Sequence, residues 1–405
     1  PNSEIKRHNL DFGGSYKLND KWTASFKGSY IKTDGRGRFG TGYDSGNPMQ
    51  SMKQWWQTNV NVRDQKSSYF QTRTNTTWNT TYINQNLRPI YTDNVYWTRY
   101  ENYETDSRSR ILGNVMLEYQ INDWIGLMGR VTLDTYSEVQ EERIAVGSVD
   151  VSQYSRWNNH YNENNYDFMA LINKSWDKWS LNATLGTNIR RTHVDNIYAQ
   201  TNGGLILPGL YSLENSVNNI EAPTENDSDV GVDGIFATAS VGFNNILFLE
   251  GSIRQDKFST LPRDNDTAIY WGGSASFLWS TLLDANWLSI GKLRAGYATT
   301  GNGTGPYNTS NTYTLGTPIG GQPVANTPFS NANSQLVPEE STEFEVGLEM
   351  SMFKNRLGFD YSYYDKKSVD LISPLSISPS TGFGRQWLNA GEVENKGHEL
   401  ALWGV

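Results

Sequence analysis

The sequence has no cysteine and only four histidines. Without cysteine there can be no disulfide, no thiol nucleophile and no cysteine-ligated metal. The histidines are scattered without ligand spacing, so no zinc site is expected; they are His8, His160, His193 and His398. No G-x-S-x-G or H-E-x-x-H motif occurs. Residues 35–40 match G-x-G-x-x-G, but residues 41–46 are a poor start for a helix, so a dinucleotide site is not expected either. These absences favour a protein that is not an enzyme.

Long apolar runs are also missing. The mean hydropathy is -0.62, and no uninterrupted apolar run approaches the roughly 18 residues that a membrane helix needs. Transmembrane helices are therefore excluded, but a β-barrel escapes this test because only alternate residues face lipid. The net charge of -9 argues against a nucleic-acid partner. The chain opens at Pro1 without a charged and apolar leader, so we expect any signal peptide to lie upstream or to have been removed.

The residues that are abundant are those of strands and turns, with 37 Gly, 23 Tyr and 14 Trp. Residues 166–189 show the pattern most clearly, because two arms alternate with period two around a very short turn. The arms approach the roughly 9 to 11 residues that a tilted strand needs to cross a bilayer. Trp176 and Trp179 lie at the turn, where an aromatic girdle is expected. On the second arm the apolar face holds Trp179, Leu181, Ala183, Leu185 and Ile189.

The same hairpin pattern recurs along the chain and predicts about thirteen strands. Five more hairpins cover residues 10–30, 111–133, 235–253, 270–300 and 344–363, and an unpaired strand covers 393–403. Long connections separate them, at residues 34–107, 137–164, 192–233, 257–269, 301–338 and 368–390. Short turns that alternate with long loops are typical of an outer-membrane barrel, with periplasmic turns and extracellular loops.

The predicted fold is therefore all-β, an antiparallel transmembrane β-barrel over residues 1–405. Bacterial single-chain barrels have an even number of strands, and lipid does not tolerate an open sheet edge. We therefore expect this chain to be a piece of a larger closed barrel. Its alternating apolar residues should face lipid, among them Leu181, Ala183, Leu185, Leu247, Leu249, Phe359 and Tyr361.

The longest connection carries the candidate binding residues. Aromatic rings offer large contact area at low entropic cost, which suits stacking on sugars or gripping peptides. The alternative is that the rings pack the loop against itself, and the sequence leaves both interpretations open. The residues predicted to contact a substrate or a partner protein are Trp55, Trp56, Arg88, Tyr96, Trp97 and Arg99.

Acidic residues offer fewer candidates. Residues 226–229 and 264–266 are Asp-rich loop stretches that can supply oxygen ligands to Ca²⁺, but neither has the spacing of a dedicated calcium loop, so solvated carboxylates are favoured. A row of alternate residues on one strand would line the lumen: Glu343, Glu345, Gly347 and Glu349. The three glutamates could form an ion path. We expect them to pair with Arg or Lys of neighbouring strands rather than to form an ion path.

Several short motifs resemble those of the SusC/RagA-like TonB-dependent transporters of Bacteroidota, in the family's order. Residues 49–55 look like "M-x-S-x-x-Q-W" and residues 211–216 like "Y-S-L-x-N-S". Residues 254–262 look like "R-x-D-x-S-S-x-L-P", with Arg254 and Asp256, and residues 293–302 like "L-R-x-S-x-x-x-x-G-N" with Gly296 in place of Ser. The last match, "N-x-G-x-x-x-N-x-G-x-E", is carried by Asn389, Gly391, Asn395, Gly397 and Glu399.

The resemblance implies a 22-stranded outer-membrane barrel with an N-terminal plug and a TonB box, and neither plug nor box is visible in this sequence. It implies import of an oligosaccharide or peptide, powered by the TonB complex and assisted by a SusD-like lipoprotein lid, without a cofactor. Two other classes stay open: an outer-membrane barrel enzyme such as a lipase or protease, and a soluble all-β glycan-binding protein. A barrel enzyme needs a set of catalytic residues, and no residue spacing in this sequence indicates one. A soluble glycan-binding protein does not explain why aromatic residues lie at the ends of the apolar faces.

Overall fold

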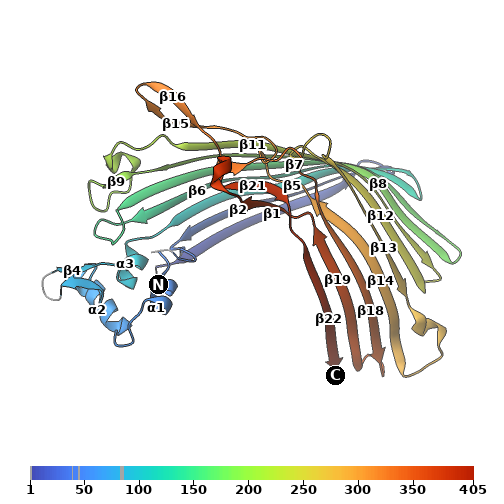
Figure 1. The fold of residues 1–405 in the computed structure, drawn as a ribbon. Helices are drawn as coiled ribbons and strands as arrows, with labels where there is room; N and C mark the ends of the chain where they lie inside the picture. The colour runs from blue at the N-terminus through green and yellow to red at the C-terminus, as the bar shows by residue number, and fades with distance from the viewer. Residues whose placement is uncertain (1, 39, 44–45, 83–85) are drawn as a thin grey trace.

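The computed structural model describes residues 2–38, 40–43, 46–82 and 86–405, and its main element is an antiparallel sheet of 13 strands (Figure 1). Each strand pairs with the next along the sheet, as the hairpin pattern predicts. In order the strands are β1 (Glu4–Lys17), β2 (Trp22–Arg36), β5 (Thr105–Asn122), β6 (Ile125–Ile144), β7 (Gln153–Trp176), β8 (Trp179–Gln200), β11 (Thr224–Phe243), β12 (Leu247–Phe258), β13 (Thr267–Phe277), β14 (Leu288–Asn302), β18 (Glu339–Met352), β19 (Leu357–Val369) and β22 (Val393–Gly404). The predicted strand count and fold class are confirmed.

The remaining elements lie in the long connections. Residues 37–104 contain α1 (Pro48–Gln54), α2 (Val62–Thr72), β3 (Thr80–Tyr82), β4 (Asn86–Pro89) and α3 (Val95–Tyr100). The other connections hold β9 (Asn202–Leu205), η1 (Leu213–Asn215), β10 (Ser216–Asn218), η2 (Trp279–Leu282), β15 (Thr314–Ile319), β16 (Gln322–Asn326), β17 (Ser330–Asn331), β20 (Ile372–Ser376), η3 (Pro379–Thr381) and β21 (Arg385–Asn389). Among the described helices, none is long and apolar enough to cross a membrane.

The predicted short turns are formed by residues that tolerate the left-handed conformation. Asp177 has φ 48° in the two-residue turn between β7 and β8, and Asn244 and Asn245 have φ 51° and 57° between β11 and β12. Asp and Asn adopt positive φ more readily than other residues with a side chain. The turns therefore fix the strand register at the edge of the sheet opposite to the long connections.

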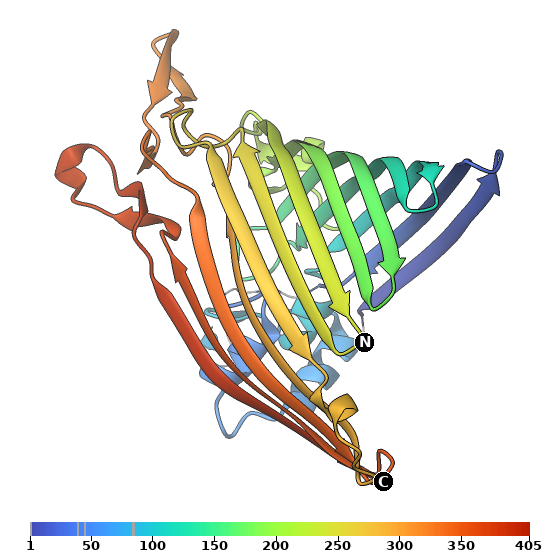
Figure 2. The ribbon, with the colours of Figure 1, turned by 90° about the vertical axis from the view of Figure 1, so that its right-hand side faces the viewer.

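The register gives the sheet one apolar and one polar face. Leu185 of β8 lies opposite Ala237 of β11, which in turn lies opposite Ile253 of β12. On the other face, Asn182 lies opposite Ser240, and Ser240 opposite Glu250. The predicted lipid-facing residues all lie on the apolar face, where Leu185 is 57% and Leu249 49% exposed. Figure 2 shows that the sheet is curved like the wall of a barrel.

The apolar face has the height of a bilayer core. In β8 it begins at Trp179, whose ring packs on Phe243 with centroids 4.7 Å apart, and it ends at Ile189. Ten steps of about 3.3 Å, tilted by roughly 40°, span about 25 Å, the height of the apolar band in outer-membrane barrels. Beyond Ile189 the same face carries Arg191, His193 and Asp195. The aromatic girdle predicted at the β7–β8 turn is therefore present.

The strands continue well past the ends predicted from the sequence. The predicted loop 137–164 is reduced to residues 145–152, because β6 runs to Ile144 and β7 starts at Gln153. Likewise the predicted loops 192–233 and 257–269 shrink to 201–223 and 259–266. Outside the bilayer both faces of a strand meet water, so the apolar alternation that marks a strand disappears although the backbone ladder continues.

Candidate functional site

The polar face of the sheet contains a groove with a volume of about 700 Å³ that crosses strands β8 to β19. Its lining combines polar and charged side chains of the polar face with glycines, alanines and Tyr297. Glu250 accepts hydrogen bonds from Ser240 and Ser274, each 3.4 Å away. The remaining polar lining includes Asn182, Thr184, Thr238, Ser252, Thr300, Ser341, Glu343, Glu345 and Lys366. Such a surface offers polar and charged partners to a hydrated solute, together with apolar atoms of its alanines and of Tyr297.

The three glutamates of the predicted lumenal row are paired with cations of neighbouring strands, as predicted. Glu343 lies 3.9 Å from Lys366, Glu345 lies 3.5 Å from Arg294, and Glu349 lies 3.4 Å from Lys292. These distances join a carboxylate oxygen to the nearest cationic nitrogen. Since each charge has a partner, the row of glutamates does not form an uncompensated ion path.

Arg294 joins three strands of the wall. Its guanidinium donates to both oxygens of Asp360, at 2.7 and 3.1 Å, and reaches across β18 to do so. Gly347 makes this reach possible, because a Cβ there would lie 2.5 Å from the guanidinium carbon. The sequence pattern predicted a lumenal row with a glycine at this position, but not the cation that lies over it.

Residues 37–104 form a folded unit rather than a structureless loop. Asn94 is fully buried and donates to the carbonyl oxygens of Gln65 at 2.9 Å and Thr76 at 2.8 Å, which ties α2 to the segment before α3. Tyr69 is also fully buried, and its hydroxyl donates to Glu101 at 2.5 Å. Burial raises the pKa of Tyr69 to about 12. We call residues 37–104 the extracellular segment, after the side of the membrane predicted for them from the sequence.

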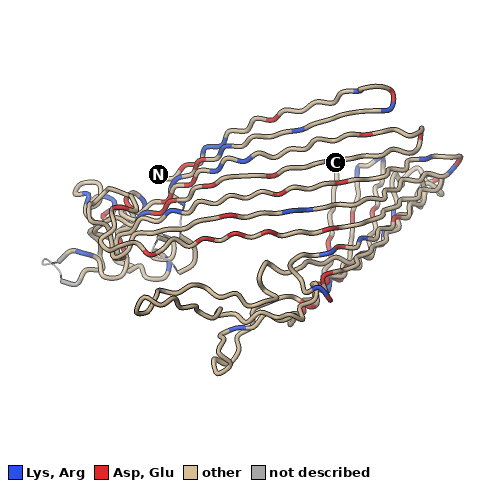
Figure 3. The backbone as a smooth tube through the Cα atoms, turned by 90° about the horizontal axis from the view of Figure 1, so that it is seen from above, with Lys and Arg blue, Asp and Glu red and all other residues tan. Residues whose placement is uncertain are grey.

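A second contact joins the extracellular segment to the connection between β6 and β7. Asp93 accepts hydrogen bonds from the Asn75 side chain at 2.6 Å and from the Val149 backbone at 2.8 Å. Burial raises the pKa of Asp93 above its usual range. The Trp97 indole nitrogen donates to Ser148 at 2.8 Å, in the same connection. Charged residues of both signs gather where the first strands meet this segment (Figure 3).

The predicted contact residues differ in exposure. Trp55 is 46% exposed at the end of α1, whereas Trp97 is only 9% exposed and packs against Ala145 of the β6–β7 connection. Trp56 is half-buried, and its indole nitrogen donates to the Val60 carbonyl at 3.0 Å. Tyr96 is half-buried as well and packs edge-on against Phe70. A role in binding stays a prediction for these aromatic residues, and Trp55 offers the most accessible ring of the four.

The two predicted basic contacts also lie apart from each other. Arg88 is exposed on β4. Arg99 is half-buried and donates to the Gly37 carbonyl at 3.1 Å, and burial lowers the pKa of its guanidinium. Arg99 therefore anchors the start of the extracellular segment to its end, while Arg88 remains at the surface as a predicted contact.

Asn389 and Gly391 of the motif brace the strand ends that carry the long connections. Asn389 donates to the carbonyl oxygens of Val337 at 2.9 Å and Asp370 at 2.7 Å, and accepts from the Val337 backbone at 3.0 Å. It thus fastens together the two connections on either side of β18 and β19. A Cβ at Gly391 would lie 2.7 Å from Leu371, so only glycine fits this close approach. Sequence reasoning found these residues through the motif alone, without their role.

The other motif residues line the polar face. Arg254 donates to Asp256 at 2.8 Å, and Asp256 is 7% exposed beside the apolar cluster of Val232, Phe258, Leu261 and Leu336. In β22 the motif residues are alternate residues that all lie on the polar face: Asn395, Gly397 and Glu399. Tyr364 covers Gly397, since a Cβ there would lie 2.5 Å from the tyrosine hydroxyl.

Of the two Asp-rich stretches, for which the sequence favours solvated loop carboxylates over calcium binding, only residues 264–266 lie in a loop. Residues 226–229 lie within β11, so Asp227 and Asp229 point to one face while Asn226 and Ser228 point to the other. The four side chains therefore cannot surround one ion. Asp266 lies 3.5 Å from Lys257, and the side-chain amide of Asn265 donates to the Leu336 carbonyl at 3.3 Å. Calcium binding at residues 264–266 stays a prediction.

Comparison with known proteins supports this architecture. The chain is 26% identical over 267 residues to TonB-dependent receptor P3 of Formosa agariphila, a match that covers 64% of this chain and 26% of that protein. It is 30% identical over 202 residues to TonB-dependent receptor P26 of the same organism, covering 48% of this chain and 20% of that protein. The chain thus matches only about a quarter of the length of these curated relatives.

Solved structures share the fold. The RagAB peptide transporter superposes with a TM-score of 0.77 at 20% identity, over 99% of this chain and 44% of that chain. The ferric-catecholate import receptor Fiu of E. coli K12 superposes with a TM-score of 0.58 at 11% identity, over 99% of this chain and 55% of that chain. At these identities the likeness concerns the fold alone.

The family model described as TonB dependent receptor-like, beta-barrel matches residues 1–405. It confirms the resemblance inferred from the motifs and agrees with the apolar band of about 25 Å on the wall. With its polar groove, its apolar face and its braced connections, the chain belongs to the family of TonB-dependent receptor β-barrels of the outer membrane.

Proposed function

We propose that this chain forms part of the wall of a TonB-dependent importer that carries an oligosaccharide or a peptide across the bacterial outer membrane. The observation that carries the proposal is the groove on the polar face, whose lining of hydroxyls, amides and paired charges suits a solute that keeps much of its water. The wall binds and guides the solute and performs no covalent chemistry. The TonB complex supplies the energy for its release.

Two observations bear on the class of solute. The charged groups of the groove, such as Glu343 and Lys366, can pair with the backbone amides and charged termini of a peptide. RagAB, which shares the fold, is named as a peptide transporter. The exposed ring of Trp55 instead suits stacking on a sugar. Both classes are therefore retained, and uptake assays separate them.

A SusD-like lipoprotein lid is the proposed partner at the extracellular side. Large apolar side chains are exposed on the long connections, with Met49 at 53%, Tyr91 at 75%, Leu315 at 87% and Ile319 at 74%. Leu315 and Ile319 belong to the β15–β16 hairpin, which projects from the wall in Figure 1. Apolar groups outside the membrane are often contacts for another protein.

The function is tested by deleting the gene for the full-length receptor and measuring uptake of labelled oligopeptides and labelled oligosaccharides. We expect uptake of one class to be lost, to return on complementation, and to stop when an uncoupler removes the energy source of TonB. Uptake of both classes at wild-type rates in the deletion strain would disprove the proposal.

Affinity purification of the receptor in mild detergent tests the lid. The lid should co-purify as a lipoprotein, and it should be lost when residues 314–326 are replaced by a short Gly-Ser linker.

A further inference from the structure

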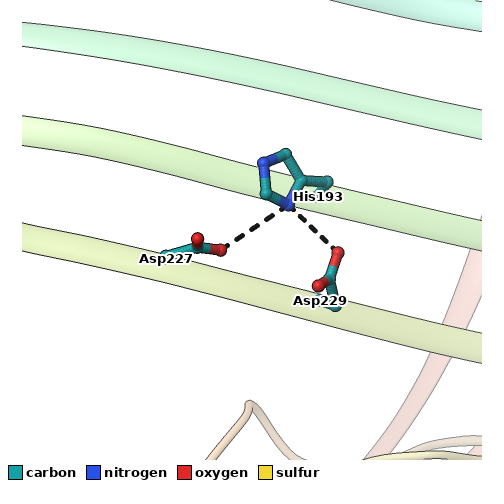
Figure 4. A group of neighbouring side chains, drawn as sticks. All are labelled: His193, Asp227 and Asp229. Carbon is teal, nitrogen blue, oxygen red and sulfur yellow. Dashed lines mark hydrogen bonds and ion pairs between the residues drawn. The ribbon is translucent and has the colours of Figure 1, made fainter.

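Three side chains with metal-binding atoms meet on the outer face of the wall. His193 of β8 lies directly opposite Asp229 of β11, and Asp227 lies two residues further along the same strand. The three share the face that carries the apolar band, but lie beyond its end at Ile189. Figure 4 shows that both carboxylates point toward the same edge of the imidazole ring. Two neighbouring strands of a rigid ladder therefore hold the group together.

The distances fit a single bound metal ion. The Nδ1 atom of His193 lies 3.0 Å from a carboxylate oxygen of Asp229 and 3.7 Å from one of Asp227. The three ligand atoms all lie within 4.8 Å of one another. Ligands that bind one tetrahedral Zn²⁺ at about 2.0 to 2.2 Å are separated from each other by roughly 3.4 Å. The two measured separations lie on either side of that value, so small side-chain rotations complete the geometry.

The charge around the group also favours a cation. Within the part of the chain that the structure describes, neither Asp227 nor Asp229 forms an ion pair with Lys or Arg, since the nearby Arg191 pairs with Asp233 at 2.6 Å. Asp195 lies opposite Asp227 on the same face and adds a further carboxylate. His193 alone carries at most one positive charge against these three carboxylates. A divalent ion would balance the excess.

We propose that His193, Asp227 and Asp229 form a binding site for a divalent transition-metal ion of the Zn²⁺ class, which links β8 to β11 on the outer face just beyond the lipid. Imidazole nitrogen and carboxylate oxygen together suit zinc and its first-row neighbours. Ca²⁺ and Mg²⁺ fit less well, because Ca²⁺ takes six to eight oxygen ligands and Mg²⁺ retains most of its water. The remaining coordination positions face outward and would be filled by water.

The site differs from the calcium ligands expected of residues 226–229, because it uses alternate residues of a strand and a histidine from its neighbour. It does not depend on which solute the receptor imports. The competing explanation is an ordinary ion pair between protonated His193 and the two aspartates, which would need no metal.

The test is a titration of the purified full-length receptor in detergent, stripped with EDTA, with Zn²⁺ by calorimetry and with Co²⁺ by visible absorption. The wild-type protein should bind one equivalent of Zn²⁺ that His193→Ala does not bind with comparable affinity. We expect a loss greater than the roughly tenfold that removal of an outer-shell partner causes. Co²⁺ should give the absorption bands of a site with nitrogen and oxygen ligands, and a large molar excess of Ca²⁺ should not displace Zn²⁺.

His398→Ala is the matched control, because His398 also lies on the outer face but its Nδ1 pairs with the Tyr361 hydroxyl at 2.8 Å instead of with carboxylates. It should retain the wild-type stoichiometry. Asp229→Asn keeps the shape of the side chain and serves as a second variant should His193→Ala fail to assemble. Equal Zn²⁺ affinity in the wild type and Asp229→Asn, or the absence of a bound equivalent in the wild type, would overturn the proposal and leave the ion pair. Displacement by Ca²⁺ would overturn the assignment to the Zn²⁺ class.

Discussion

The wall and the extracellular segment are held together in different ways. The wall is a continuous ladder in which each strand is paired with its neighbours, in strands of up to 24 residues, so no single side chain holds it. The extracellular segment has helices of only 6 to 11 residues and depends on a few buried polar groups, such as Asn94 and Asp93. The loss of stability caused by a substitution in the wall should therefore depend on which face of the sheet carries the residue. In the extracellular segment it should depend on how deeply the residue is buried.

The largest effect is expected on the apolar face of the wall. Leu185→Arg places a charge near the middle of the apolar band and should cost about 2 to 4 kcal/mol. The fraction of heat-resistant folded barrel after extraction measures this loss. Asn182→Arg, on the polar face of the same strand, is the control and should assemble normally. Should the control be the variant that fails, the assignment of the two faces would be reversed.

In the extracellular segment, Asn94→Ala should cost about 1 to 3 kcal/mol, because two buried carbonyl groups and the start of α3 lose their partner. The loss should be confined to the segment, since the wall does not depend on it. Protease digestion of intact cells should cut residues 37–104 faster, while the barrel remains folded. Asn59→Ala at an exposed position is the control. Loss of the whole barrel would show that the two regions fold as one unit.

The sequence predicts the wall far better than the segment, for a physical reason. Between Trp179 and Ile189 the residues on one face are apolar except Thr187, and this period is visible in the sequence. In residues 153–165 of β7 both faces meet water, so strand and loop have the same composition there and the predicted loop is too long. The contacts of Asn94 or Asn389 join residues distant in the chain, and no local pattern encodes them. The grouping of His193 with Asp227 and Asp229 could not be predicted either, because it exists only across two paired strands.

Substitution of Trp55 and Trp56 tests whether these rings bind a partner or only pack the segment. If they contact solute or lid, changing both to Ala should weaken that binding by about 2 kcal/mol or more for each contacting ring. Uptake should fall as a result, without unfolding of the segment. The exposed Trp55 should account for most of this loss, because Trp56 is already bonded to Val60. Uptake and surface proteolysis are measured on the same double variant. Faster proteolysis would instead support a packing role, and wild-type behaviour in both assays would contradict both roles.

The smallest effect is expected on the polar face, at Arg294. Arg294→Lys keeps the charge but loses the paired hydrogen bonds to both oxygens of Asp360. Since the guanidinium is 28% exposed in a hydrated groove, solvent screens the pair and the loss should stay below about 1 kcal/mol. Thermal unfolding of the purified receptor measures this loss of stability. Lys366→Arg is the control, because Lys366 lies farther from its partner Glu343, at 3.9 Å. A loss as large as that of Leu185→Arg would mean that water is excluded from this part of the groove, so that the polar face is packed against another part of the receptor rather than open to solute.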